Sequence, residues 1–118
     1  MSAILGTGID IIEVDRIAKA IERWGDHFLN HVFCPEEIDY ARQHKSPAQH
    51  FAVRFAAKEA ILKAVGDNSH LVWKDMTILN DKNGKPYCVY NKKKIKNTVH
   101  ISLSHTQIYA VASAIITE

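Results

Sequence analysis

Two acidic residues and a lysine interrupt stretches of the chain that are otherwise apolar. Asp10 lies within GIDII near the N-terminus, and Glu59 and Lys63 lie within RFAAKEAILKAVG at residues 54–66. An aspartate fits poorly inside a strand, and a buried charge needs compensation. Two carboxylates that meet at a cleft suit magnesium, whose other positions are filled by water and substrate phosphates. We therefore predict Asp10 and Glu59 as metal ligands, with Lys63 and Lys58 as cations for phosphate oxygens.

A simpler interpretation of the same residues stays open at this point. Glu59 and Lys63 are four residues apart, in the orientation that favours a helical ion pair worth about 0.2–0.5 kcal/mol. Such a pair is sufficient explanation on an exposed helix face, and Asp10 alone suits a strand end. Beside a carboxylate Lys63 stays protonated, which favours a charge clamp over a general base.

Two further segments carry groups that bind anions. SLSHTQ, residues 102–107, ends a predicted strand with the side chains of Ser104, His105 and Thr106. Hydroxyl and imidazole groups can bind a phosphate or a heterocycle, but hydroxyls at a strand end also satisfy backbone groups. NGKP, residues 83–86, has the composition of a turn, and Lys85 at its tip could touch an anion.

A basic stripe follows one side of the first predicted helix. Arg16, Lys19 and Arg23 are spaced i, i+3 and i+7. An ordinary solvated face explains this spacing, and so does a docking strip that attracts an acidic partner. The spacing alone does not decide between the two.

The pattern of apolar residues predicts the elements that hold these groups. It indicates a strand over residues 3–14, a helix over 15–24, a helix beginning at CPEEIDYARQ, and a long helix that Pro47 opens and Gly66 ends. The second half reads as strands DMTILND and PYCVYN around a KNGK hairpin, then TVHISLSH and IYAVASAII. This order predicts an α+β fold, with an antiparallel sheet, joined by the first strand, packed on helices.

Size and composition narrow the class of protein. The 118 residues, 47% hydrophobic and 24% charged, predict a single globular domain over residues 1–118. A net charge of +2 does not argue for nucleic acid, and the apolar opening segment is too short to span a membrane. Without a basic leader, and with two cysteines, the cytoplasm is the expected location. His27, His31 and Cys34 lack a fourth ligand for a structural zinc site.

Taken together, the motifs are more specific than each one alone. GIDIIEVDRI, RFAAKEAILKAVG, NGKP and ISLSHTQIYAVASAII, in that order, resemble the holo-[acyl-carrier-protein] synthase family, the short bacterial 4'-phosphopantetheinyl transferases. The resemblance implies transfer of 4'-phosphopantetheine from coenzyme A to a serine of apo acyl carrier protein, in support of fatty acid biosynthesis. Adenosine 3',5'-bisphosphate is the by-product. A homotrimer with coenzyme A in clefts between subunits is also implied.

The resemblance assigns roles residue by residue. It implies magnesium on Asp10 and Glu59, catalytic roles for these two and Lys63, and carrier-protein docking by the basic stripe. Coenzyme A is expected to contact Arg54, Lys58, Lys63, Gly66, Asn83, Gly84, Lys85, Pro86, Ser104, His105 and Thr106. Two other classes remain: a non-catalytic module that binds nucleotides or acidic proteins, and a magnesium-dependent hydrolase of nucleotides or thioesters.

Overall fold

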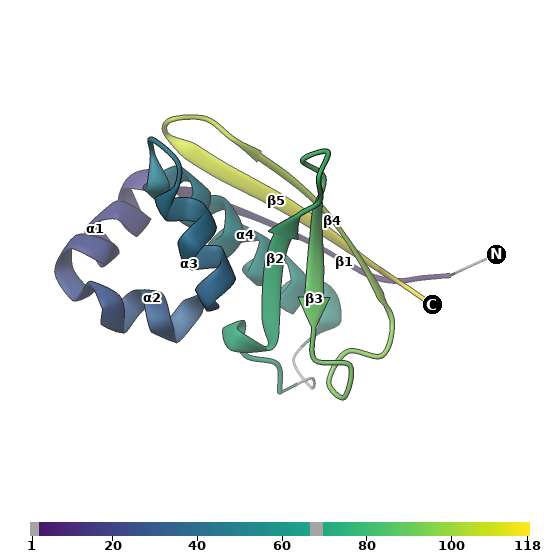
Figure 1. Cartoon of the computed structure of the whole chain (residues 1–118). Helices are drawn as coiled ribbons and strands as arrows, with labels where there is room; N and C mark the ends of the chain where they lie inside the picture. Colours follow the sequence, from purple (N-terminus) through teal and green to yellow (C-terminus); the bar gives the residue numbers. More distant parts are fainter. Residues whose placement is uncertain (1–2, 67–69) are drawn as a thin grey trace.

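A long helix runs through the middle of the molecule (Figure 1). The structure, a computed structural model, describes residues 3–66 and 70–118. The central helix packs on a three-stranded antiparallel sheet with the strand order β1-β5-β4. The bounds of these elements are α4 (Pro47–Val65), β1 (Ile4–Glu13), β5 (Tyr109–Thr117) and β4 (Thr98–His105).

Three short helices and a hairpin complete the fold. The helices lie near one end of α4, and the hairpin lies with β2 against α3 and α4 and with β3 beside β4 (Figure 1). They are α1 (Val14–Trp24), α2 (Asp26–Val32), α3 (Pro35–Arg42), the 3-10 turn η2 (Trp73–Asp75) and the hairpin strands β2 (Met76–Asn80) and β3 (Pro86–Tyr90). Because elements from both halves of the chain cover α4, the buried core surrounds this helix.

The predicted α+β class with antiparallel strands is confirmed, but the prediction of one sheet is wrong. The hairpin strands β2 and β3 pair with each other and form a separate two-stranded sheet. Met76 and Ile78 on β2 are fully buried, so the hairpin uses its apolar face to cover the helical layer. Helix α2 and the turn η2 were not predicted, because each is shorter than the windows in which apolar periodicity is visible.

Small residues let the sheet approach α4 closely. A Cβ added at Gly6 or Gly8 would collide with the carbonyl oxygen of Ala64 or Ala60, so only glycine fits at these two strand positions. Alternate residues of a strand face the same side. Asp10 is therefore carried toward α4 with the two glycines, within reach of the side chains that α4 presents at this edge.

The other face of the sheet is apolar and open in the single chain. Ile9 is 64% exposed and Ile11 is 63% exposed, and Ile115 on the neighbouring strand is also exposed. A contiguous exposed apolar patch marks an interaction surface more often than scattered single residues do.

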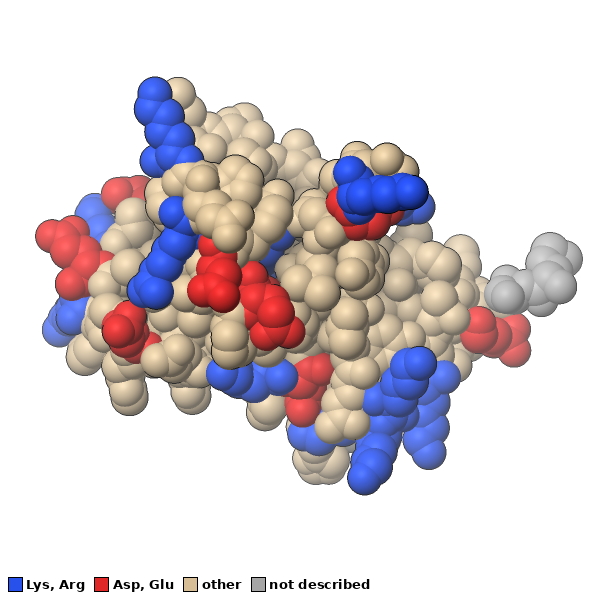
Figure 2. Space-filling view, in the orientation of Figure 1, with Lys and Arg blue, Asp and Glu red and all other residues tan. Residues whose placement is uncertain are grey.

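Charged side chains are mixed on the face in Figure 2. Lysines, arginines and acidic residues alternate over the short helices, and further lysines gather beside the β3–β4 connection, whose sequence is NKKKIK. Within the part of the chain that the structure describes, no helix is long and apolar enough to cross a bilayer.

Candidate active site

Asp10 and Glu59 line the same cavity. This cavity has a volume of about 290 Å³, and its wall is formed by β1, α1, α2 and α4. Asp10 is half-buried on β1, and Glu59 is half-buried on α4. Arg16 of α1 and Phe55 of α4 also line it. The structure thus brings together two carboxylates that are far apart in the sequence, as the sequence predicts.

Lys63 lies beside Asp10 and not beside Glu59. Its Nζ is 3.3 Å from Oδ1 of Asp10 and donates a hydrogen bond of 2.9 Å to the carbonyl oxygen of Ile9. The helical ion pair between Glu59 and Lys63, which the simpler interpretation of the sequence offered, is therefore not formed. The Lys63 side chain is 58% exposed, so its ammonium can turn from Asp10 to a phosphate without unfolding anything.

Glu59 is held by a tryptophan that the sequence analysis missed. Nε1 of Trp73 donates a hydrogen bond of 3.1 Å to Oε2 of Glu59. The indole ring packs between Phe55 and His31, at centroid distances of 5.7 and 5.6 Å. A partly buried indole N–H needs a hydrogen-bond acceptor. This requirement could have indicated from the sequence that Trp73 binds a polar group, but the sequence does not indicate which one.

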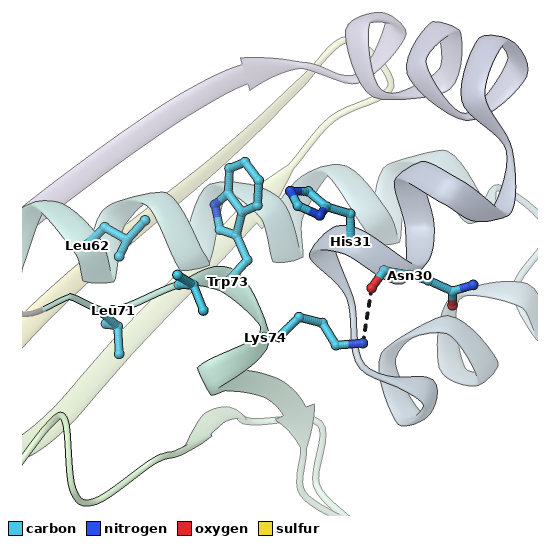
Figure 3. Close-up of a pocket in the computed structure, with 7 residues that line it drawn as sticks. Asn30, His31, Leu62, Leu71, Trp73 and Lys74 are labelled. Atoms are coloured by element: carbon cyan, nitrogen blue, oxygen red, sulfur yellow. Dashed lines mark hydrogen bonds between the residues drawn. The ribbon is translucent and has the colours of Figure 1, made fainter.

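Trp73 also lines a second cavity (Figure 3). It has a volume of about 480 Å³ and is mostly apolar, with Leu62 and Leu71 in its wall. Lys74 crosses its edge and donates a hydrogen bond of 3.1 Å to the carbonyl oxygen of Asn30. Trp73 therefore lines this cavity and also donates the hydrogen bond to Glu59.

The prediction that Lys58 offers a cation to a phosphate is wrong. Its side chain is fully buried and points to the opposite side of α4 from Lys63, where Nζ lies 2.7 Å from Oε1 of Glu37. Nζ also donates a hydrogen bond of 2.7 Å to the carbonyl oxygen of Val32. The ammonium is therefore committed to the interior, because burial of a charged amine is tolerated only with such partners.

Several of the other predicted residues gather at a different cavity. Arg54, Gly84, Pro86 and His105 line a space of about 190 Å³. Tyr40, His50, Val53, Asn80 and Leu103 complete its wall, and none of these residues lines the Asp10–Glu59 cavity. Within one chain, the predicted site residues are thus divided between two separate cavities.

The turn at residues 81–85 is shaped by its own hydrogen bonds. Oδ1 of Asp81 accepts hydrogen bonds from the backbone N–H groups of Asn83 and Lys85. Gly84 has φ of +87°, a left-handed conformation that glycine adopts without strain. The side chains of Asn83 and Lys85 are left exposed beside the cavity, and neither lines it.

Of three further residues predicted to contact coenzyme A, two have a local structural role and the third lies on the other face of its strand. The Thr106 hydroxyl accepts hydrogen bonds from the N–H groups of Ile108 and Tyr109, which closes the β4–β5 turn. Ser104 lies on the opposite face of β4 from His105, because side chains alternate along a strand. Gly66 ends α4 with φ of +94°, which confirms it as the predicted stop.

The basic stripe is exposed but not uniform. Lys19 forms an ion pair of 2.8 Å with Asp15, one turn earlier on α1. The guanidinium of Arg23 lies over the exposed Trp24 ring, 4.9 Å from its centroid. Arg16 reaches the Asp10–Glu59 cavity, so one end of the stripe adjoins the two carboxylates.

The two carboxylates fit a magnesium ion by the chemistry of their oxygens. Mg²⁺ takes one or two protein carboxylates and completes its coordination with water and phosphate oxygens. Among residues 3–66 and 70–118, no group of three or more His, Cys, Asp or Glu side chains is arranged to hold a metal ion.

The sequence and the fold match one class of enzyme. The model of the 4'-phosphopantetheinyl transferase superfamily matches residues 6–115, and the chain belongs to this superfamily. Within it, a protein of Koribacter versatilis named holo-[acyl-carrier-protein] synthase is 43% identical over 96% of this chain and 98% of its own. A protein of the same name from Protochlamydia amoebophila is 44% identical over 94% and 96%. The family resemblance in the sequence is therefore confirmed.

Solved structures agree with these relatives. The holo-(acyl-carrier-protein) synthase of Bacillus anthracis, in complex with CoA (3',5'-ADP), matches with a TM-score of 0.86 at 34% identity. The match covers 98% of this chain and 97% of that one. The enzyme of Helicobacter pylori, in complex with coenzyme A, matches with a TM-score of 0.84 at 28% identity and covers 93% and 98%.

Proposed function

We propose that this protein transfers the 4'-phosphopantetheine group of coenzyme A to a serine of an apo acyl carrier protein. The products are the holo carrier protein and adenosine 3',5'-bisphosphate, and the reaction serves fatty acid biosynthesis. Membership of the superfamily supports the reaction, as do the names of the relatives and their complexes with coenzyme A. The observation that carries the proposal is the meeting of Asp10 and Glu59 at one cavity, with Lys63 beside Asp10.

Asp10 and Glu59 would hold the metal ion. A bound Mg²⁺ would supply positive charge that offsets the negative charge of the diphosphate. Trp73 keeps Glu59 in place through its indole hydrogen bond, so the carboxylate does not have to be ordered when substrate arrives.

Lys63 would act as the charge clamp on the phosphates. In the free protein its ammonium is held by Asp10 and by the carbonyl oxygen of Ile9. As the bond to the leaving adenosine bisphosphate breaks, negative charge grows on the leaving phosphate, and a nearby ammonium stabilises it. A Lys63 side chain turned to the phosphate would no longer occupy Oδ1 of Asp10.

The nucleotide end of coenzyme A would occupy the cavity of Arg54 and His105. The wall of this cavity includes the turn glycine Gly84 and the buried guanidinium of Arg54, and none of the described residues that line it carries a carboxylate. Such a site suits an anionic nucleotide. The exposed side chains of Asn83 and Lys85 lie next to it on the same turn.

We also propose that the enzyme is a homotrimer with its active sites between subunits. The open apolar face of the sheet, with Ile9 and Ile11, gives a second copy a surface to cover. A neighbouring copy could also bring its Arg54–His105 cavity next to the Asp10–Glu59 cavity, so that one coenzyme A molecule spans both. An Ile9→Lys/Ile11→Lys variant should sediment as a monomer and lose turnover. A trimer retained by this variant would contradict the proposed interface.

Each subunit would function as one domain over residues 1–118, in the cytoplasm. Both cysteines, Cys34 and Cys88, are free thiols, which fits a reducing compartment. An acidic carrier protein would dock on the α1 stripe of Arg16, Lys19 and Arg23. Docking there would place the carrier serine near the carboxylates, because Arg16 lines their cavity.

A mass measurement tests the reaction. The protein is incubated with coenzyme A, Mg²⁺ and apo acyl carrier protein, and the carrier is then weighed by mass spectrometry. The proposal predicts that the carrier gains one phosphopantetheine group and that adenosine 3',5'-bisphosphate appears in equal amount. A carrier of unchanged mass with intact coenzyme A would favour a binding module, and coenzyme A consumed without carrier would favour a hydrolase.

A further inference from the structure

Three histidines from three different segments meet at the cavity of Arg54. The ring of His50, on α4, lies 4.0 Å from that of His44 and 5.6 Å from that of His105, between centroids. Tyr40 of α3 packs against both His44 and His50. His50 and His105 line the cavity, while His44 stands behind His50. None of these contacts was predicted from the sequence.

The imidazole of His44 is fixed by a hydrogen bond, and the other two are not. Nδ1 of His44 lies 2.7 Å from the carbonyl oxygen of Tyr40, and because a carbonyl only accepts, this nitrogen carries a hydrogen. In the described part of the chain, the rings of His50 and His105 make ring contacts but no hydrogen bond. Their nitrogens are free to bind a ligand that enters the cavity.

Arg54 brings a buried positive charge to the same place. The residue is 2% exposed, and its guanidinium donates to the carbonyl oxygens of Ile78 and His50 and to the side-chain oxygen of Asn80. These acceptors are all neutral, and no carboxylate within the described residues forms an ion pair with Arg54. Burial therefore lowers the pKa of Arg54 from its usual value. A buried cation whose hydrogen-bond acceptors are all neutral favours the binding of an anion.

The surroundings of His50 keep its imidazole neutral in the free protein. Its titratable or charged neighbours are Tyr40 and His44 from the α3 side, Arg54 on its own helix, and His105 at the end of β4. Burial, and then the positive potential of His44, Arg54 and His105, lower the pKa of His50 to about 4. A phosphate dianion about 4 Å away opposes this potential and is sufficient to return an imidazole pKa from about 4 to about 7.

We propose that His50 makes anion binding in this cavity proton-coupled: a phosphate monoester enters as a dianion, and the imidazole cluster takes up one proton from solvent. The inference rests on the proposed function, because coenzyme A carries a 3'-phosphate monoester in addition to its diphosphate. The proton goes to a ring nitrogen of His50, which then donates a hydrogen bond to a phosphate oxygen. No covalent bond forms or breaks. Binding of coenzyme A thus strengthens as the pH falls from 8 toward 7.

Calorimetry measures this coupling directly. Coenzyme A, or dephospho-coenzyme A, which lacks the monoester, is titrated into the protein with Mg²⁺ in two buffers of different ionisation enthalpy. Measurements between pH 7 and 8 keep the monoester dianionic, since its second pKa is about 6. His50→Gln removes the proton acceptor and keeps a polar side chain. His27→Gln is the matched control, because His27 is exposed on α2 and lines a different cavity.

The expected result is uptake of about half a proton per coenzyme A at pH 7, with affinity falling by about twofold between pH 7 and pH 8. Dephospho-coenzyme A should bind without uptake, His50→Gln should lose most of it, and His27→Gln should keep it. Coenzyme A binding without uptake would overturn the inference, as would equal uptake by dephospho-coenzyme A or by His50→Gln. In each of these cases, phosphopantetheine transfer in the mass assay would leave the proposed function standing.

Discussion

Replacing Lys58 by methionine tests whether this lysine stabilises the protein interior or takes part in the reaction. Lys58 and Glu37 form a fully buried ion pair of 2.7 Å. Glu37 also accepts hydrogen bonds of 2.9 Å from the backbone N–H groups of Cys34 and Ile78. Lys58→Met keeps the side-chain length but leaves a buried carboxylate without its cation. Breaking such a pair costs about 3–5 kcal/mol, a large part of the roughly 5–15 kcal/mol that stabilises a typical domain.

Urea unfolding, followed by circular dichroism, measures this loss. All variants are compared at one protomer concentration, because self-association stabilises the folded state by mass action. Lys63→Met is the matched control. Lys63 is 58% exposed, so removing its ion pair with Asp10 costs about 1 kcal/mol or less. The transfer assay should give the opposite order. Turnover should fall in Lys63→Met, and turnover per folded molecule should be unchanged in Lys58→Met.

A second variant keeps the test decisive if Lys58→Met does not fold. Adding Glu37→Gln removes the unpaired buried charge, so the double variant should be more stable than Lys58→Met alone. The assignment of Lys58 to the interior would be refuted if Lys58→Met lowered the free energy of unfolding by less than about 1 kcal/mol and abolished coenzyme A-dependent turnover. That result would mean that the Lys58 ammonium reaches the substrate.

Three further predictions concern the positions around the two cavities. Trp73→Phe keeps an aromatic ring but removes the donor to Glu59, and turnover at low Mg²⁺ should fall by about 10–100-fold, with recovery at high Mg²⁺. Unchanged turnover at low Mg²⁺ would show that Trp73 does not position Glu59. Gly8→Ala should lower the free energy of unfolding by about 1–3 kcal/mol, measured in urea, because the new Cβ meets the Ala60 carbonyl oxygen; wild-type stability would contradict this packing. In the folded protein the pKa of His50 is lowered to about 4, so the stability of the fold is highest above pH 6.5, the ordinary pKa of histidine, and falls as the pH drops below it. The urea midpoint of His50→Gln should therefore fall less between pH 7 and pH 5 than the midpoint of the wild type. Equal falls would argue against the lowered pKa.

Much of the fold could be predicted because its elements have clear local signals. The apolar runs around Asp10, the proline at the start of α4 and the glycine after it give β1 and α4 nearly their observed bounds. The division into two sheets could not be predicted, since strand pairing depends on which apolar faces meet across the core. The hairpin buries Met76 and Ile78 against the helical layer, and β3 lies beside β4 without pairing with it.

The parts of the candidate site that could be predicted are those where the type of residue leaves few possible roles. A carboxylate in a strand and another in an alanine-rich helix have few explanations, and the structure places Asp10 and Glu59 at one cavity. Lys58 and Lys63 look equivalent in the sequence, yet five residues of helix carry them to opposite sides of α4. Trp73 could not be assigned to Glu59, because an indole donor gives no indication of its acceptor.

Titration with a divalent ion tests whether Asp10 and Glu59 hold a metal ion. Mn²⁺, a spectroscopic substitute for Mg²⁺, is titrated into the protein in the presence of coenzyme A and followed by electron paramagnetic resonance. We expect one bound ion for each protomer. The affinity for Mn²⁺ should fall by at least about tenfold in Asp10→Asn and in Glu59→Gln, with the fold intact. Wild-type affinity in either variant would show that the two carboxylates do not hold the cation.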